Sequence, residues 1–247
     1  RWRYEFLFLE LQSRKNNEKI IWRYMMSINE EYDSRCKKIG SNLIHETAII
    51  EENVTIGDNN FIGPYCLITG NTIVGDNNRF EAYVSVGTPA EHRDYFKSSS
   101  GSVIIGNGNI IREFVTINGS TKNITKVGDN ITLLRGSHLG HDAIIESNVN
   151  ISCNAMVGGH TYIMKGSNLG LNVLVHQFQI IGSFSMIGMG SVVTKKIKIE
   201  PGFTWVGNPV SKLKTNEIGL ERQNVTDEIL KSETQRFYEL SKTITHS

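Results

Sequence analysis

The sequence predicts an all-β solenoid, a left-handed parallel β-helix of hexapeptide repeats, with a short α-helical tail at its C-terminal end. The main observation is a strict period of six: all thirteen residues at every sixth position from Val127 to Ile199 are aliphatic. Neither an α-helix nor an ordinary β-strand has this period, whereas short internal repeats are typical of β-solenoids. Glycine often follows the aliphatic position, which suits tight corners because glycine adopts positive φ without strain.

The same period orders the upstream part of the chain. Residues 44–86 keep one phase of the repeat, residues 105–117 keep a second, and residues 127–199 keep a third. The two changes of phase fall at 88–102 and 118–126, and both stretches are polar. We therefore predict that they are loops expelled from the coil and not breaks in its core.

Three segments follow from this pattern. Residues 1–41 form an N-terminal arm, in which 16–35 have helical apolar spacing. Because Met25 and Met26 offer a start within the arm, part of it is expected to be non-native. Residues 42–209 form the β-helix domain. Residues 210–247 form a helical tail, in which Thr226 and Asp227 offer a helix N-cap.

Composition narrows the classes of function. The formal net charge is +1 and lysine and arginine form no long run, so a nucleic-acid-binding stripe is unsupported. The apolar stretch 4–11 is short and carries two glutamates, so no stable membrane insertion is expected. The chain has three scattered cysteines, Cys36, Cys66 and Cys153. They are too few for a disulfide framework or a cysteine metal site, and a cytoplasmic location is expected.

Repeat arithmetic brings distant polar residues together. Three faces of six residues make a turn of about eighteen, and residues eighteen apart then stack about 4.8 Å from one another. His141, Gly159 and Gln177 share one column, and Asp142 and His160 share the next. Two more histidines flank these columns: His138 and His176. Four of the seven histidines therefore converge at one corner of the coil.

This cluster has the parts of an acid–base site. Histidine is the usual general base near neutral pH, and an acceptor on its second ring nitrogen orients it. We predict His141 as the base, Asp142 as its orienting partner and the Gly159 N–H as the donor to a developing oxyanion. Two alternatives stay open. Polar corner residues often bond only to backbone, and histidines on adjacent turns can bind Zn²⁺, as in β-helical carbonic anhydrases. No sequence feature forces a third ligand into tetrahedral reach, so no metal is predicted.

At these residues the sequence resembles a known family. The segments "SHLGHD", "VGGH", "VHQF" and "NEIGLER", together with "NIIREFVTI", are similar in order and spacing to UDP-N-acetylglucosamine O-acyltransferases, which begin lipid A synthesis. The resemblance covers about residues 42–222. It implies a homotrimer with sites between neighbouring subunits, an acyl carrier protein thioester as acyl donor, and no cofactor.

The resemblance also assigns roles by position. His141, Asp142 and Gly159 keep the catalytic roles given above. The substrate contacts that it implies are Glu91 and Arg93 on the sugar nucleotide, His138, His160, His176 and Gln177 along the sugar and acyl site, and Asn216 and Arg222 at the nucleotide end. Met189 falls where the family gauges acyl length, so its bulk predicts a shorter chain than glycine would allow.

The sequence departs from the family in three places. The usual "PQDLKY" is "PAEHRD" here, Gln223 replaces the second arginine after "GL", and the C-terminal part is short. The leading hypothesis is transfer of a (hydroxy)acyl group from acyl carrier protein to the 3-hydroxyl or 3-amino group of UDP-N-acetylglucosamine. Because of these departures, a coenzyme A-dependent N-acetyl- or short-chain acyltransferase acting on an amino sugar nucleotide is the alternative. A non-catalytic trimeric scaffold and a zinc hydratase are two further hypotheses.

Overall fold

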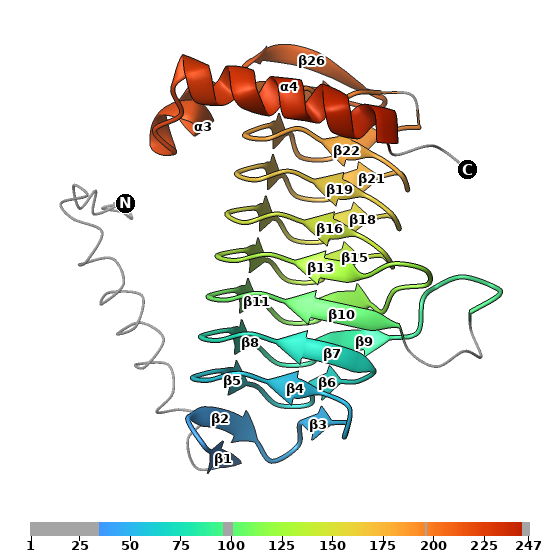
Figure 1. Cartoon of the computed structure of the whole chain (residues 1–247), viewed down its shortest axis with the longest axis vertical. Coiled ribbons are helices and arrows are strands. Elements are labelled where there is room, and N and C mark those ends of the chain that lie inside the picture. The colour runs from blue at the N-terminus through green and yellow to red at the C-terminus, as the bar shows by residue number, and fades with distance from the viewer. Residues whose placement is uncertain (1–34, 96–100, 196, 244–247) are drawn as a thin grey trace, which may run out of the picture. The chain divides into compact units, whose positions relative to one another are not determined.

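The computed structural model describes residues 35–95, 101–195 and 197–243 (Figure 1). The chain divides into two compact units, residues 1–36 and 37–247, and the second contains the coil. The helical spacing predicted over 16–35 and the expected start at Met25 or Met26 lie, apart from Arg35, outside the described residues. The fold prediction is confirmed: the second unit is a left-handed parallel β-helix with a short C-terminal helical part.

Three sheets run along the coil. The first contains β1 (Cys36–Ile39), β2 (Asn42–His45), β5 (Phe61–Ile62), β8 (Arg79–Phe80), β11 (Ile110–Ile111), β14 (Thr132–Leu133), β17 (Asn150–Ile151), β20 (Asn168–Leu169), β23 (Met186–Ile187), β25 (Phe203–Gly207) and β26 (Val210–Thr215). The second contains β3 (Ile49–Ile50), β6 (Leu67–Ile68), β9 (Ser85–Thr88), β12 (Thr116–Asn118), β15 (His138–Leu139), β18 (Met156–Val157), β21 (Leu174–Val175) and β24 (Val192–Val193). The third contains β4 (Thr55–Ile56), β7 (Asn71–Val74), β10 (Ser102–Ile105), β13 (Thr125–Val127), β16 (Ile144–Ile145), β19 (Tyr162–Ile163) and β22 (Ile180–Ile181).

The core consists of the residues that the six-residue period selects. Every sixth residue from Val127 to Ile199 is buried, and its neighbours one turn away are the equivalent residues, as in the pairing of Leu139 with Val157. One aliphatic side chain per face therefore fills the inside of each turn. Burial of these side chains is the main stabilising contribution, because each removes its apolar surface from water. The stacked turns join them into one continuous cluster.

Both predicted loops leave the coil at the same corner. The first loop connects β9 to β10, and the second connects β12 to β13, so each runs from the second sheet to the third. Pairing continues across both: Ile111 contacts Phe80 on one side and Leu133 on the other, in unbroken parallel register. The coil therefore keeps its core while two loops accumulate at the corner between the second and third sheets.

The C-terminal part caps the coil and differs in one respect from the predicted helical tail. It begins with a strand, β26, which forms an antiparallel hairpin with β25 through a turn at residues 208–209. Asn-Pro is a favourable turn sequence, so the chain reverses before it becomes helical. Helices α3 (Glu217–Arg222) and α4 (Asp227–Thr243) follow. Figure 1 shows α4 lying across the β22 end of the coil.

Helix α4 is held against the third sheet by apolar and ionic contacts. Phe237 is fully buried against Met164 and Ile180. Next to it, Arg236 forms an ion pair with Glu146. Among the described residues, no helix combines the length and the apolar character needed to cross a membrane.

Candidate active site

The predicted histidine cluster lies at the corner between the second and third sheets. His141 and Asp142 follow β15, and Gly159 and His160 follow β18, one turn further along. The second residue of each pair has left-handed backbone, with φ of 59° at Asp142 and 56° at His160. Aspartate accepts this conformation more readily than most residues, because its short side chain bonds to nearby backbone. The corner geometry therefore presents these side chains side by side.

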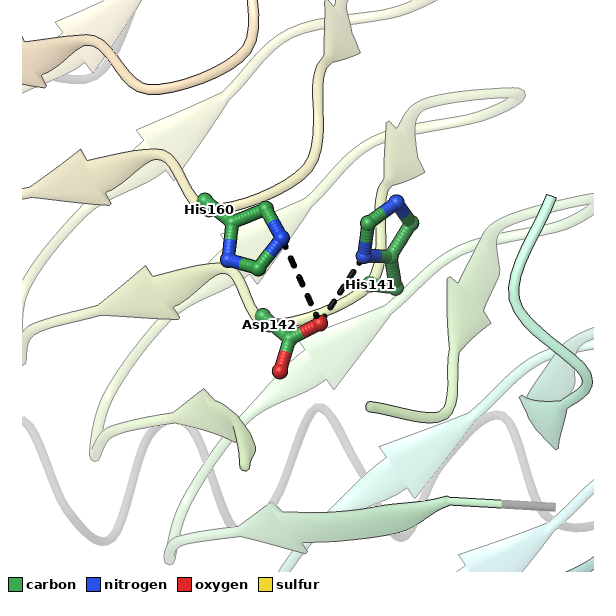
Figure 2. Close-up of side chains that lie close together, drawn as sticks. All are labelled: His141, Asp142 and His160. Carbon is green, nitrogen blue, oxygen red and sulfur yellow. Dashed lines mark hydrogen bonds and ion pairs between the residues drawn. The ribbon is translucent and has the colours of Figure 1, made fainter. Parts of the chain in front are cut away.

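His141 and Asp142 form a hydrogen-bonded pair. The Nδ1 atom of His141 lies 2.8 Å from Oδ2 of Asp142, and Figure 2 marks this contact with a dashed line. The Asp142 side chain is fully buried, and His141 is 9% exposed. Because a carboxylate only accepts hydrogen bonds, Nδ1 donates to Asp142, and Nε2 is the ring nitrogen without this partner. In a neutral imidazole this is the tautomer that a general base requires.

Asp142 also holds the second loop in place. Its Oδ2 accepts hydrogen bonds from the backbone N–H and the hydroxyl of Thr121, and its Oδ1 accepts from the N–H groups of Lys122 and Asn123. Burial raises the pKa of Asp142, but the hydrogen bonds from His141, Asn123 and Thr121 together lower it by more than burial raises it. The net pKa is therefore well below the ordinary value. Asp142 is therefore an ionised carboxylate that links His141 to the second loop.

The imidazole of His141 rests directly on Gly159. A Cβ atom at Gly159 would lie 2.8 Å from both Cε1 and Nε2 of His141. At this distance the imidazole or the backbone would have to move. Only a residue without a side chain allows this approach. Within residues 35–95, 101–195 and 197–243, the Gly159 N–H donates no hydrogen bond. The structure thus brings together the predicted base, its predicted partner and the free amide that the sequence analysis placed in adjacent columns.

His160 lies behind the His141–Asp142 pair. Its ring stacks on Phe178 with centroids 4.5 Å apart and meets the His141 ring edge-on at 5.0 Å. Its Nε2 is 3.7 Å from Oδ2 of Asp142 (Figure 2). Burial lowers the pKa of His160, although Asp142 raises it in part. In one chain, His160 does not line the cleft described next. Its contact with a substrate stays a prediction.

A cleft of about 510 Å³ opens in front of His141. Its polar end contains Glu91 from the first loop, Asn118 at the end of β12, and His138, whose Nδ1 lies 2.8 Å from the Thr116 hydroxyl. Burial has the largest effect on the pKa of His138 and lowers it, Glu91 raises it and His141 lowers it, so the net pKa is below the ordinary value. His138 is therefore neutral at pH 7.

The cleft continues past His141 as an apolar stripe on the outer face of the second sheet. Met156, Leu174 and Val192 stand in consecutive turns and pair in register. His176 and Gln177 line the cleft beside this stripe, and both are exposed. The order along the coil axis is a polar pocket, then the base and the Gly159 amide, and then an apolar groove.

Besides His160, four predicted contact residues lie outside this cleft. Arg93 is exposed on the first loop, and Met189 is 74% exposed at the corner between the first and second sheets. Asn216 donates from Nδ2 to the carbonyl oxygen of Phe184, at the corner between the third and first sheets, and Arg222 ends the short helix α3 next to it. In one chain, Asn216 and Arg222 therefore lie at a different corner from His141.

The sequence analysis missed two residues near the base. His92 of the first loop has its ring centroid 6.1 Å from that of His141, and Asn118 lines the polar end of the cleft. A signal for both exists in the repeat. Val86 and Ile117, which precede the two loops, belong to the same stacked column as Leu139, so both loops had to begin beside His141.

The metal alternative has a candidate ligand group but a poor donor set. Ligand atoms of His141, Asp142 and His160 lie within 4.8 Å of one another. However, both oxygens of Asp142 already accept two or more hydrogen bonds from the loop and from His141. A cation would have to displace these donors. The arrangement fits a hydrogen-bonded base better than a zinc site.

Comparisons with known proteins show the family and the fold. The family model of the bacterial transferase hexapeptide (six repeats) matches residues 53–88. An acyl-[acyl-carrier-protein]–UDP-N-acetylglucosamine O-acyltransferase from Paraburkholderia phymatum is 39% identical over 201 residues, which cover 73% of this chain and 76% of that protein. The enzyme of that name from Synechocystis is 37% identical over 58% of this chain, and the match spans about half of the relative, 51%. The crystal structure of the Francisella novicida UDP-N-acetylglucosamine acyltransferase is 29% identical, with a TM-score of 0.68, and the match covers 81% of this chain and 85% of that one.

Proposed function

We propose an activity for this chain from its family, the acyl-[acyl-carrier-protein]–UDP-N-acetylglucosamine O-acyltransferases, to which it belongs. The chain moves a (hydroxy)acyl group from an acyl carrier protein thioester to the 3-position of UDP-N-acetylglucosamine. This reaction is a step of lipid A biosynthesis. The observation that carries the proposal is the contact between the His141 imidazole and Gly159, beside a cleft that is polar at one end and apolar at the other.

The proposed reaction needs one base and one anion donor. Nε2 of His141 removes the proton from the 3-hydroxyl group as its oxygen attacks the thioester carbonyl carbon. The new C–O bond places negative charge on the carbonyl oxygen, which the Gly159 N–H stabilises. Collapse of this intermediate breaks the C–S bond, and the imidazolium of His141 returns its proton to the departing thiolate. Asp142 keeps the imidazole oriented throughout and stabilises its charged form.

The cleft suggests how the two substrates lie. Glu91 and His138 offer hydrogen bonds to a sugar at the polar end, and Met156, Leu174 and Val192 offer an apolar groove to an acyl chain. The reacting carbon then falls between the two, next to His141. Met189 stays a proposed gauge of acyl length.

We propose a homotrimer with the site completed by a neighbouring copy. In one chain, Asn216 and Arg222 lie at a different corner from His141. If both residues contact the nucleotide as predicted, they come from the adjacent subunit. Sedimentation equilibrium measures the assembly, and mixing His141→Ala chains with Arg222→Ala chains restores activity only if sites are shared. We expect a cytoplasmic location.

Mass spectrometry of the acylated product tests the function. UDP-N-acetylglucosamine is incubated with acyl carrier protein thioesters and coenzyme A thioesters of several chain lengths, in parallel. We expect 3-acylated product from the carrier protein donors and a loss of turnover of roughly 10²- to 10⁴-fold in His141→Ala. A melting temperature close to that of the wild type controls for folding. The alternative gains support if only coenzyme A donors react, and no turnover with either donor favours a scaffold. Near-normal turnover of His141→Ala contradicts the mechanism.

A further inference from the structure

Asn118 occupies a distorted position where the second loop begins. Strand β12 pairs regularly with β9 as far as Ile117 and Val86, and then the register shifts so that Asn118 lies opposite Thr88. The residue that is passed over, Gly87, has a φ of +81°. A β-bulge of this kind redirects a side chain, and such bulges are common next to active sites. Here it turns Asn118 out of the regular ladder at the polar end of the cleft.

The amide of Asn118 is buried and its orientation is set. The residue is 3% exposed. Its Nδ2 donates to the carbonyl oxygen of Pro89 and contacts the hydroxyl oxygen of Thr88, both at 3.3 Å. Because the Pro89 carbonyl can only accept, the nitrogen must face it, and Oδ1 points the other way.

The Oδ1 atom of Asn118 has no hydrogen-bond donor among the described residues. Buried polar atoms are nearly always paired, so an unpaired one needs an explanation. Asn118 lines the cleft together with Glu91 and His138, and the loop that it begins returns to Asp142. The unpaired acceptor thus belongs to a residue of the wall that a bound ligand would touch.

We propose that Oδ1 of Asn118 accepts a hydrogen bond from the acceptor sugar, from a donor on a carbon next to the reacting 3-position. This inference rests on the proposed function and adds a specificity-determining contact to it. The donors at those carbons are the 2-acetamido N–H and the 4-hydroxyl group. An amide oxygen that is fixed by Pro89 can only accept, so it selects sugars that carry such a donor and rejects analogues without one.

Binding of UDP-N-acetylglucosamine to two Asn118 variants tests the contact by calorimetry, without turnover. Asn118→Leu keeps the volume and removes the acceptor, and Asn118→Asp keeps acceptor oxygens but loses the donor to Pro89. We expect roughly ten- to hundredfold weaker binding for Asn118→Leu, since a buried partner is removed, and a smaller loss for Asn118→Asp. The matched control is Asn109→Leu, because Asn109 is a buried asparagine outside the cleft whose oxygen and nitrogen are both bonded. It is expected to lower stability and leave affinity unchanged.

Substrate analogues identify the donor. The 2-deoxy and 4-deoxy analogues of UDP-N-acetylglucosamine each lack one candidate group. We expect one of them to bind Asn118→Leu as well as it binds wild type, because the contact is already absent. If Asn118→Leu binds the parent sugar as tightly as wild type does, the contact does not exist. The same conclusion follows if the substitution weakens the binding of both analogues as much as it weakens the binding of the parent sugar. If wild type neither binds nor acylates the parent sugar, the proposed function fails and this inference fails with it.

Discussion

Replacing Gly159 by alanine tests the site with a single methyl group. The φ of Gly159 is not in the left-handed range, so alanine is compatible with the backbone, and the N–H is kept. The new Cβ would lie 2.8 Å from two ring atoms of His141. Restoring a normal contact of about 3.5 Å requires the imidazole to move by roughly 0.7 Å. Misplacement on the order of 1 Å costs about 10²-fold in rate, so we expect kcat to fall 10- to 100-fold, or about 1.4–2.7 kcal/mol in activation free energy.

Steady-state kinetics with an acyl carrier protein donor measure this loss. We expect the change mainly in kcat, because the methyl group disturbs the base and not the polar pocket. The control is Gly40→Ala at the far end of the coil, where φ is +60° and no atom lies within 4 Å of the new Cβ. That variant is expected to lose about 1 kcal/mol of stability through its backbone alone and to keep its kcat. A wild-type kcat for Gly159→Ala would show that His141 does not act beside this amide.

Three further predictions follow from the same contacts. Asp142→Asn is expected to lose about 2–4 kcal/mol of stability, because an amide nitrogen would face the loop N–H groups. Since folding depresses the pKa of Asp142, its contribution is complete above the unfolded value of about 3.9 and is lost as pH falls below it. The free energy of unfolding measured in urea should therefore decrease as the pH falls below about 4, and it should decrease more in wild type than in the variant. Phe237→Ala removes a fully buried side chain, and we expect faster hydrogen exchange in α4 with the coil unchanged; uniform loss across the coil would contradict a local role. Purified protein is expected to hold no stoichiometric zinc and to keep its activity in EDTA, because the oxygens of Asp142 are already bonded; loss of activity restored by zinc would favour the hydratase hypothesis.

The coil was predictable because its signal is strictly periodic. One aliphatic residue in six has to face inward on every turn, so the pattern identifies the core residue by residue. The hairpin of β25 and β26 was not predicted, because it follows the last hexad and has no period to reveal it. Predicting it requires the Asn208-Pro209 turn to be considered together with the apolar residues on either side. The predicted domain boundaries stay a prediction.

The site was predictable where it follows the repeat and not where it leaves it. His141, Asp142 and Gly159 were placed by their spacing, because columns of eighteen residues convert sequence into distance. The loops have no such rule. Whether Arg93 or Asn118 faces the cleft depends on how each loop returns to the coil, which the side chain of Asp142 partly decides through its bonds to the second loop.

The interruptions of the repeat distinguish an enzyme from a scaffold. A coil with unbroken hexads has flat outer faces, and a scaffold needs nothing more. In this chain both interruptions leave from the corner that carries His141, and each contributes a wall of the cleft, through Glu91 and through Asn118. The buried carboxylate of Asp142 is then shared between the loop and the base. A structure that needed only length would gain nothing from burying a charge at this corner, whereas a base that must keep one tautomer does.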